Sequence, residues 1–316
     1  MAMATITILG INGHASRAVA TAFFKRGWRV IGFGRSNKHP MEGVEFFSGD
    51  AGNVEDMAAA IRDADLVFNG LNLPYHQWGN GAAEGLIARV IEACGKTGKT
   101  LLFPGNIYNY APTDRVITPD LCQTPQTERG RIRVAMEARL AEAAARGDIR
   151  VIILRAGNFY GSDMNGGFFD ELILRELDKG KVCLNPARNV KNAWAYLPDL
   201  GEAFAILAER RAEFGPFENF HFKGHLKTAD ETFAAVQAVV PNKLIQTGYP
   251  WLMLKAMGVF MPIIRGLVEM RYIWDYELGL KDPRLDAILG ENFGTPYEEA
   301  IANVVRQASA TERKAA

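Results

Sequence analysis

The stretch Thr5–Arg35, TITILGINGHASRAVATAFFKRGWRVIGFGR, decides the fold. Its apolar, β-branched start predicts a buried strand. Small and apolar residues then recur at helical spacing and predict a helix over Gly13–Arg26, which Gly27 is placed to end. A second strand is expected over Arg29–Phe33. A strand, glycine turn, helix and strand in this order form the first unit of a dinucleotide-binding sheet.

The turn itself has the spacing GxxGxxS. Gly10 allows the tight turn off the strand, and Gly13 lets the backbone approach a pyrophosphate, whose charge a helix N-terminus favours. The third small position is Ser16, which still permits close packing of helix and strand. An ordinary βα turn can have the same spacing, but the strand before it and the helix after it favour a cofactor site. We expect the intervening residues to line this site: Asn12, His14 and Ala15.

The amino-acid composition limits which classes of partner are expected. The chain has 316 residues, 48% of them apolar, and its 36 basic and 36 acidic residues give no net charge. We therefore expect a small-molecule substrate, and neither nucleic acid nor a membrane as a partner. The three cysteines are an odd number at wide spacing, which predicts neither a disulfide framework nor a metal site. No signal peptide is recognised, and a cytoplasmic setting is the default expectation.

Strands and helices alternate through the first half of the chain. Further strands are expected over Val44–Phe47, Asp65–Asn69, Lys99–Phe103 and Asp148–Leu154. Helices are expected from near Val54, over Gly81–Cys94 and over Arg129–Arg146. This alternation predicts an α/β fold with a doubly wound parallel sheet, the Rossmann arrangement. We expect residues 1–180, together with about 193–212, to form the dinucleotide-binding domain.

The pattern loosens after residue 155. A glycine-rich loop, GNFYGSDMNGG, precedes an expected helix over Phe168–Asp178 and short strands near Ala193–Leu197 and Phe217–Phe222. Residues 181–316 are expected to form mainly a smaller substrate-binding lobe over the carboxyl edge of the sheet. The apolar stretch Tyr249–Val268 is interrupted by charges and prolines, which favours a buried or substrate-covering helical segment; an interfacial membrane helix is the alternative.

Several motifs together resemble the extended branch of the short-chain dehydrogenase/reductase superfamily, which contains NAD(P)-dependent epimerases and dehydratases. Besides the opening turn, the resemblance rests on GD at Gly49 and Asp50, IYNY at 107–110, LRAGNFYG at 154–161, AWAYLPDLGEAF at 193–204 and TPYEEAI at 295–301. It implies a Rossmann fold with a bound nicotinamide dinucleotide. It also implies cofactor contacts from Leu71, Asn106 and Asn158, and it allows a homodimer. Asp50 ends a strand where the adenine end of a dinucleotide should lie, and the alternative is that it begins the helix near Val54.

The catalytic stretch departs from this family. Members carry YxxxK, but TPQTERGRIRVAME at 124–137 places Arg129 at the tyrosine position and Arg133 at the lysine position. A guanidinium stays protonated and accepts no hydrogen bond, so Arg129 cannot move a proton as a phenol can, although it could stabilise an oxyanion. Arg133 could still bind ribose or phosphate. The family serine is replaced by Pro104, which marks the chain as an atypical member.

Other side chains could supply the proton. Tyr108 and Tyr110 follow the fifth strand, Tyr160 lies in the substrate loop and His76 follows the fourth strand. A phenol bonded locally, or a solvated histidine, is the alternative for each. Tyr108 is the candidate we select, with Arg133 and Arg129 beside it. His221 and His225 lie four apart, but Gly224 argues against a helix that would align them on a metal.

The residues at the end of the second strand indicate which nicotinamide dinucleotide is bound. NAD enzymes of this fold place an acidic residue there, and VIGFGRS has none, whereas Arg35 lies where a 2′-phosphate would bind. We expect NADP(H) to be preferred to NAD(H); the alternative for Arg35 is a solvated arginine in the loop. Two functions remain open. One is an oxidoreductase or epimerase-like enzyme acting on a small carbonyl or hydroxyl compound. The other is a protein that binds NADP(H) or senses its redox state without turnover.

Overall fold

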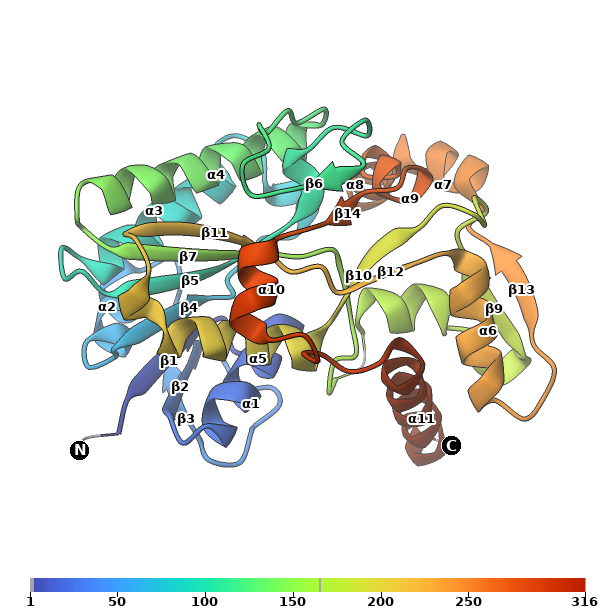
Figure 1. Ribbon diagram of the computed structural model, residues 1–316, viewed down its shortest axis with the longest axis horizontal. Helices are drawn as coiled ribbons and strands as arrows, with labels where there is room; N and C mark the ends of the chain where they lie inside the picture. Colours follow the sequence, from blue (N-terminus) through green and yellow to red (C-terminus); the bar gives the residue numbers. More distant parts are fainter. Residues whose placement is uncertain (1–2, 165, 316) are drawn as a thin grey trace.

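Seven strands run parallel in one large sheet, in the order β11-β7-β5-β4-β1-β2-β3 (Figure 1). The computed structural model describes residues 3–164 and 166–315. The strands of this sheet are β1 (Thr5–Leu9), β2 (Arg29–Gly34), β3 (Val44–Ser48), β4 (Leu66–Asn69), β5 (Thr100–Gly105), β7 (Arg150–Arg155) and β11 (Phe217–His221). The order reverses beside β1, so the carboxyl ends of β1 and β4 open a crevice where ligands bind in such sheets.

Helices cover both faces of this sheet. One face carries α1 (His14–Lys25), α5 (Leu197–Glu209) and α10 (Pro283–Leu289), and the other carries α2 (Val54–Ile61), α3 (Ala82–Cys94) and α4 (Glu128–Ala145). Successive strand residues point to opposite faces. Leu66 and Phe68 therefore pack with α1 and α5, while Val67 packs with α2 and α3. The predicted doubly wound fold is confirmed.

A smaller lobe lies beyond the carboxyl edge of the sheet (Figure 1). Its strands are β8 (Asn158–Tyr160), β10 (Asn192–Tyr196) and β12 (His225–Lys227) in one sheet, β9 (Lys181–Leu184) with β13 (Ile245–Gly248), and β6 (Val116–Ile117) with β14 (Gly279–Leu280). Its helices are α6 (Ala229–Val239), α7 (Trp251–Gly258), α8 (Pro262–Glu269), α9 (Tyr272–Asp275) and α11 (Tyr297–Ala315). The chain crosses between the two parts repeatedly, because α5 and β11 return to the large sheet.

Two segments differ from expectation. The helix expected over Phe168–Asp178 is instead a π-helical turn over Phe169–Ile173 followed by a 3₁₀ turn over Leu177–Lys179. The amide of Leu174 reaches the carbonyl of Phe169 five residues back, and Phe169, Ile173 and Leu174 are all buried in the small lobe. Burial of these side chains therefore accompanies a wider turn than an α-helix makes.

The apolar stretch expected as one segment forms two helices, α7 and α8. No helix in the described part of the chain is long and apolar enough to cross a bilayer. Leu267 of α8 lies at the crevice, as expected for a substrate-covering segment, but the outer side of the pair is not buried, since Phe260 is 87% exposed.

Ser16, which stands where the family usually has a third glycine, faces a glycine at the end of β4. Ser16 is buried on α1 and lies directly against Gly70, which follows β4. A Cβ built on Gly70 would overlap the Ser16 hydroxyl and would lie 3.0 Å from the carbonyl oxygen of Leu9. The helix and the strand therefore approach closely because position 70 has no side chain.

We expect Gly70→Ala to lower the free energy of unfolding by about 1–3 kcal/mol, because the new methyl group overpacks this contact. Chemical denaturation measures the change. Ser16→Gly should recover part of the loss in the double variant, since it removes the overlapping hydroxyl. Equal losses with and without Ser16→Gly would show that the two positions are not coupled.

Candidate active site

The N-terminus of α1 is left without a side-chain cap. Its N-cap residue is Gly13, no described side chain accepts a hydrogen bond from the first turn, and that turn has no acidic residue. Gly10 has φ of 78°, and a Cβ there would lie 3.1 Å from the backbone of Gly70. Free amide groups at a helix N-terminus bind anions. The turn therefore fits the diphosphate of a dinucleotide.

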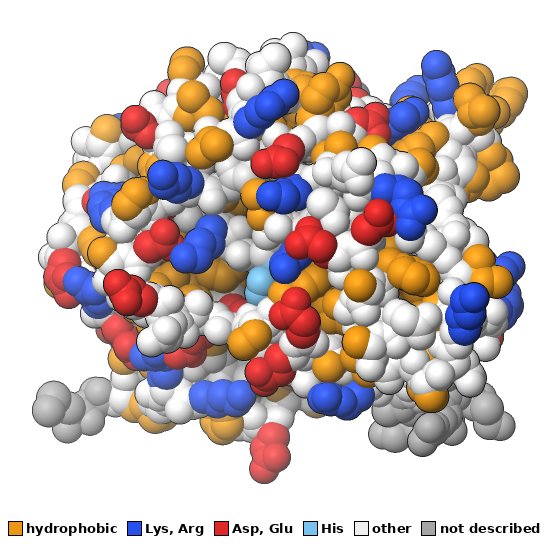
Figure 2. All heavy atoms as spheres, turned by 45° about the vertical axis from the view of Figure 1, so that its right-hand side comes forward, with side chains coloured by type: hydrophobic (Ala, Val, Ile, Leu, Met, Phe, Trp, Pro, Cys, Tyr) orange, Lys and Arg blue, Asp and Glu red, His pale blue; other side chains and the backbone are white. Residues whose placement is uncertain are grey.

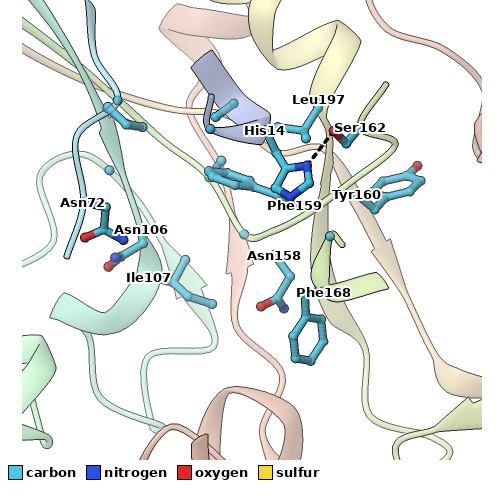
Figure 3. A pocket seen from close by; sticks show the side chains of 18 of the residues that line it. His14, Asn72, Asn106, Ile107, Asn158, Phe159, Tyr160, Ser162, Phe168 and Leu197 are labelled. Atoms are coloured by element: carbon cyan, nitrogen blue, oxygen red, sulfur yellow. Dashed lines mark hydrogen bonds between the residues drawn. The ribbon is translucent and has the colours of Figure 1, made fainter. Parts of the chain in front are cut away.

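A cavity of about 370 Å³ opens from this turn along the carboxyl edge of the sheet. It runs past the ends of β4 and β5 and past the loop after β7 to α8 and α9 of the small lobe. Figure 3 shows amide side chains on one side of it, Asn72 and Asn106, with Asn158 across the cavity beside Phe168. The Nδ1 atom of His14 lies 2.6 Å from the Ser162 hydroxyl, which joins α1 to the loop after β8.

Arg133 lies in the cavity wall, where the family has lysine. Its guanidinium donates to the carbonyl oxygen of Pro104 at 2.5 Å and lies over the rings of Phe103 and Trp78, with centroids at 4.7 and 5.9 Å. Burial lowers the pKa of Arg133. Its charge is therefore held at one place in the site by stacking and by one backbone contact.

Arg129 is not part of the cavity wall. Its side chain pairs with Glu269 of α8 and donates to the carbonyl oxygen of Tyr75 at 3.1 Å. A Cβ on Gly266 would lie 2.7 Å from the Arg129 guanidinium, so α8 also packs closely here. The residue at the family's tyrosine position thus holds the covering helix onto α4.

Tyr108 forms a phenol pair in the cavity. Its hydroxyl lies 2.5 Å from the hydroxyl of Tyr75, which is in the 3₁₀ turn Tyr75–Gln77 after β4. Burial, with Tyr75 beside it, raises the pKa of Tyr108 well above its usual value. The phenol therefore keeps its proton near neutral pH, and the hydroxyl of Tyr75 lies next to it.

The other candidate donors have other partners. Tyr160 contributes its ring to the cavity, but its hydroxyl lies 2.7 Å from Nδ1 of His225. Tyr110 is fully buried behind the wall, beneath the guanidinium of Arg155. His76 is exposed and does not line the cavity. No group of three potential metal ligands occurs among the described residues.

The predicted cofactor residues fall into two sets. The cavity wall includes Gly13, His14, Ala15, Leu71, Asn106, Arg133 and Asn158. Outside it lie Gly10, Asn12, Arg35 and Asp50. The Asn12 amide donates to the carbonyl of Ser36 at 2.7 Å and so holds the loop after β2. Asp50 accepts from the amide of Gly52, and Asn53 caps α2. Arg35 is exposed at the end of β2.

Sequence reasoning did not select several residues that the cavity brings together: Tyr75, Trp78, Ser162 and Phe168. Tyr75 and Trp78 follow the fourth strand within GLNLPYHQW, at the carboxyl edge where ligands bind. That position is a signal that could have found them. Trp274 comes from the far end of the chain, and nothing local predicts its place.

A buried ion pair lies beneath the site. Arg155, at the end of β7, donates to both carboxylate oxygens of Glu137, at 3.1 and 2.6 Å, and to the carbonyl of Asn106 at 2.5 Å. Burial by itself would raise the pKa of Glu137, but Arg155 holds it below its usual value. The Arg155 Nε donates to Nε2 of His221 at 3.3 Å, and His221 Nδ1 lies 3.3 Å from the carbonyl of Ile117. The first contact requires an unprotonated Nε2 and the second requires the proton on Nδ1, so His221 is neutral here.

A doubly wound sheet with an uncapped helix N-terminus and a lobe over its carboxyl edge defines a dinucleotide-binding α/β protein. The chain belongs to the NAD-dependent epimerase/dehydratase family, whose model matches residues 6–221. The resemblance noted in the sequence is therefore confirmed. No curated protein matches the chain.

Solved structures show the same fold at low sequence identity. MoeE5, in complex with UDP-glucose and NAD, has 18% identity and a TM-score of 0.77, covering 99% of this chain and 100% of that one. UDP-glucuronic acid 4-epimerase from Bacillus cereus, with UDP-glucuronic acid and NAD, has 13% identity and a TM-score of 0.76 over 97% and 99%. The dTDP-glucose 4,6-dehydratase from Bacillus anthracis, with NAD, has 13% identity and a TM-score of 0.75 over 99% and 98%.

We expect His221 to make stability depend on pH. Burial and the nearby Arg155 lower its pKa to about 4. The unfolded chain, with a histidine pKa of about 6.5, then binds more protons between these values, so stability falls as pH falls. From about pH 7.5 to about pH 5, the loss from this group should be about 2 kcal/mol.

Urea denaturation at both pH values measures this loss. His221→Gln should show a smaller loss than the native chain, because glutamine does not titrate. The exposed His76→Gln is the control and should leave the pH dependence unchanged. His14 and His225, whose pKa values burial lowers, and Asp170, whose pKa burial raises to about 6, contribute to the dependence that remains. An unchanged pH dependence in His221→Gln would contradict the assignment.

Proposed function

We propose that the chain is an NADP(H)-dependent oxidoreductase or epimerase-like enzyme that acts on a small, uncharged and largely apolar carbonyl or hydroxyl compound. The observation that carries the proposal is the Tyr75–Tyr108 hydroxyl pair beside Arg133, in a cavity continuous with the α1 N-terminus. A nicotinamide dinucleotide, when bound, would supply or accept the hydride. The chain's own residues would bind both ligands and hold the proton.

The proton step is assigned to Tyr108. Its hydroxyl lines the cavity and carries a proton, so it can donate to a substrate oxygen that gains charge during reduction. Burial raises the pKa of Tyr108 and opposes this transfer, whereas the charge of Arg133 lowers that pKa and favours it. Tyr75, 2.5 Å behind, can pass its own proton to Tyr108 in turn. The nearby guanidinium of Arg133 favours the anion formed in that transfer. In the family the same work falls to a tyrosine and a lysine on one helix.

The choice of substrate class rests on the wall of the cavity. On the small-lobe side this wall is apolar and aromatic: Phe159, Phe168, Leu267, Met270 and Trp274. A sugar nucleotide carries a diphosphate, which cationic side chains usually bind. Arg133 is stacked and bonded to Pro104, and Asp170 adds a carboxyl group whose pKa burial raises to about 6, so that it is mostly ionised at pH 7. We therefore propose a substrate without a phosphate group.

The preference for NADP(H) rests on Arg35. This side chain is exposed directly after β2, and the strand VIGFGRS ends without an acidic residue. An acidic residue there would bind ribose hydroxyls and repel a 2′-phosphate. Asn12 holds the backbone of the next residues, Ser36 and Lys38, so the loop bearing Arg35 is fixed beside the glycine turn.

A non-catalytic NADP(H)-binding or redox-sensing protein is the second candidate. It is favoured by Arg129, which occupies the tyrosine position and lies outside the cavity wall. The size of the cavity beyond the glycine turn favours the enzyme. Oxidation of NADPH across a panel of apolar aldehydes and ketones separates the two: binding of NADPH without any turnover would support the second candidate.

We expect Tyr108→Phe to lower kcat about 100-fold and to leave the Kd for NADPH unchanged, because the hydroxyl serves the proton step. Steady-state kinetics and fluorescence titration measure the two values. Tyr276→Phe removes an exposed hydroxyl outside the cavity wall and is the matched control. Full activity in Tyr108→Phe would rule out this proton donor.

We expect Arg35→Ala to weaken NADPH binding about 10-fold and to change NADH binding less than about twofold, since only NADPH carries the 2′-phosphate. Isothermal titration of each cofactor measures this. Lys25→Ala, which removes an exposed positive charge at the end of α1, is the control. Tighter binding of NADH than of NADPH by the native chain would overturn the preference.

A further inference from the structure

The outer side of the α7–α8 pair exposes an unusual number of large apolar side chains. They lie between residues 252 and 263: Leu252, Met253, Met257, Val259, Phe260, Met261 and Ile263. We call these residues the hairpin surface. Leu252 is 88% exposed and Phe260 87%. Figure 2 shows hydrophobic side chains projecting at the upper right, over the region of α7 and α8, with basic side chains beside them. Contiguous exposed patches of this kind mark interaction surfaces.

The hairpin surface is held in place from its inner side. Gly258 lets α7 approach α8 closely, because a Cβ there would lie 3.2 Å from the Cα of Arg265. Trp251 is buried, and Glu269 of α8 pairs with Arg129 on α4. The exposed apolar side chains therefore project from a packed pair of helices.

The charges around this surface have one sign. Lys255 and Arg265 are exposed, and no ion pair involves either of them within the described residues. Between residues 249 and 271 the acidic side chain is Glu269, which turns inward to Arg129. An apolar protrusion flanked by unpaired basic groups complements a surface that is apolar within and anionic outside. An anionic lipid bilayer has that character.

A second copy of the chain fits less well. In a two-fold pairing the same patch meets itself, so the Lys255 and Arg265 groups of both copies would be brought together. Like charges at a desolvated interface are unfavourable. A membrane that the helices cross is also excluded within the described part of the chain, because none of its helices is long and apolar enough.

We propose that the hairpin surface docks onto the face of an anionic lipid bilayer, with Leu252, Phe260 and Ile263 at the level of the headgroups and acyl chains. The helices lie on the membrane and do not span it. Leu267 and Met270, on the inner side of the same region, line the cavity. Docking would therefore bring the cavity wall close to the lipid. The expectation of no membrane partner rested on the charge balance of the whole chain, and that sum does not report a local apolar and basic surface.

Flotation of the full chain with vesicles tests the proposal. We expect binding to phosphatidylcholine vesicles that contain roughly 30% phosphatidylserine, and at least about fivefold less binding to phosphatidylcholine alone. Leu252→Ser with Phe260→Ser should reduce binding about 10-fold or more, because two large apolar anchors are lost. Lys255→Gln with Arg265→Gln should remove most of the preference for phosphatidylserine.

Ile245→Ser is the matched control, since Ile245 is 60% exposed on β13, outside the hairpin surface, and its loss should leave binding unchanged. Circular dichroism of each variant checks that it folds. Failure of the native chain to bind either vesicle, or equal binding by the Leu252→Ser, Phe260→Ser variant, would overturn the proposal. So would a native dimer in analytical ultracentrifugation that the same variant converts to monomer, because the surface would then bind a second copy.

Discussion

The site depends on the ion pair between Arg155 and Glu137. Arg155 has no exposed surface, so burying the pair costs the hydration free energy of both charges. Contacts within the protein must offset that cost. Glu137, the carbonyl of Asn106 and His221 together satisfy the guanidinium. Removing either partner would leave a buried charge unpaired, at a cost of about 3–5 kcal/mol. These contacts fasten α4, β7, β11 and the loop after β5 to one another.

The contacts of Arg155 and Glu137 position Tyr108 and Arg133. Asn106, held by Arg155 through its carbonyl, caps the turn that carries Tyr108 by accepting from the Tyr108 amide at 3.1 Å. Four residues before Glu137 on α4, Arg133 enters the cavity wall. Arg129, four residues earlier still, lies outside the cavity wall and pairs with Glu269 of α8. The helix that carries the family's tyrosine and lysine thus has the same place here as α4. Its tyrosine position, Arg129, contacts the small lobe instead of the cavity.

The large sheet was predictable because its strands are short apolar runs separated by glycine turns and amphipathic helices, all local signals. The glycine turn is a local signal too, whereas the positions of Asn106, Tyr108 and Arg133 came from the resemblance to the family. Tyr75 and Trp274 could not be placed, because their positions depend on contacts between distant segments. The π-helical turn at Phe169 and the exposure of Phe260 were missed for a related reason: apolar composition does not say which side of a helix another element will cover.

The contact between Ser16 and Gly70 constrains how the family's usual glycine at the third position could have been replaced. A serine at position 16 fits because position 70 has no Cβ. With alanine at position 70 the same serine hydroxyl would overlap a methyl group. The side chain allowed at position 16 is therefore conditional on the residue at position 70, and the two positions act as one unit although they lie on separate elements.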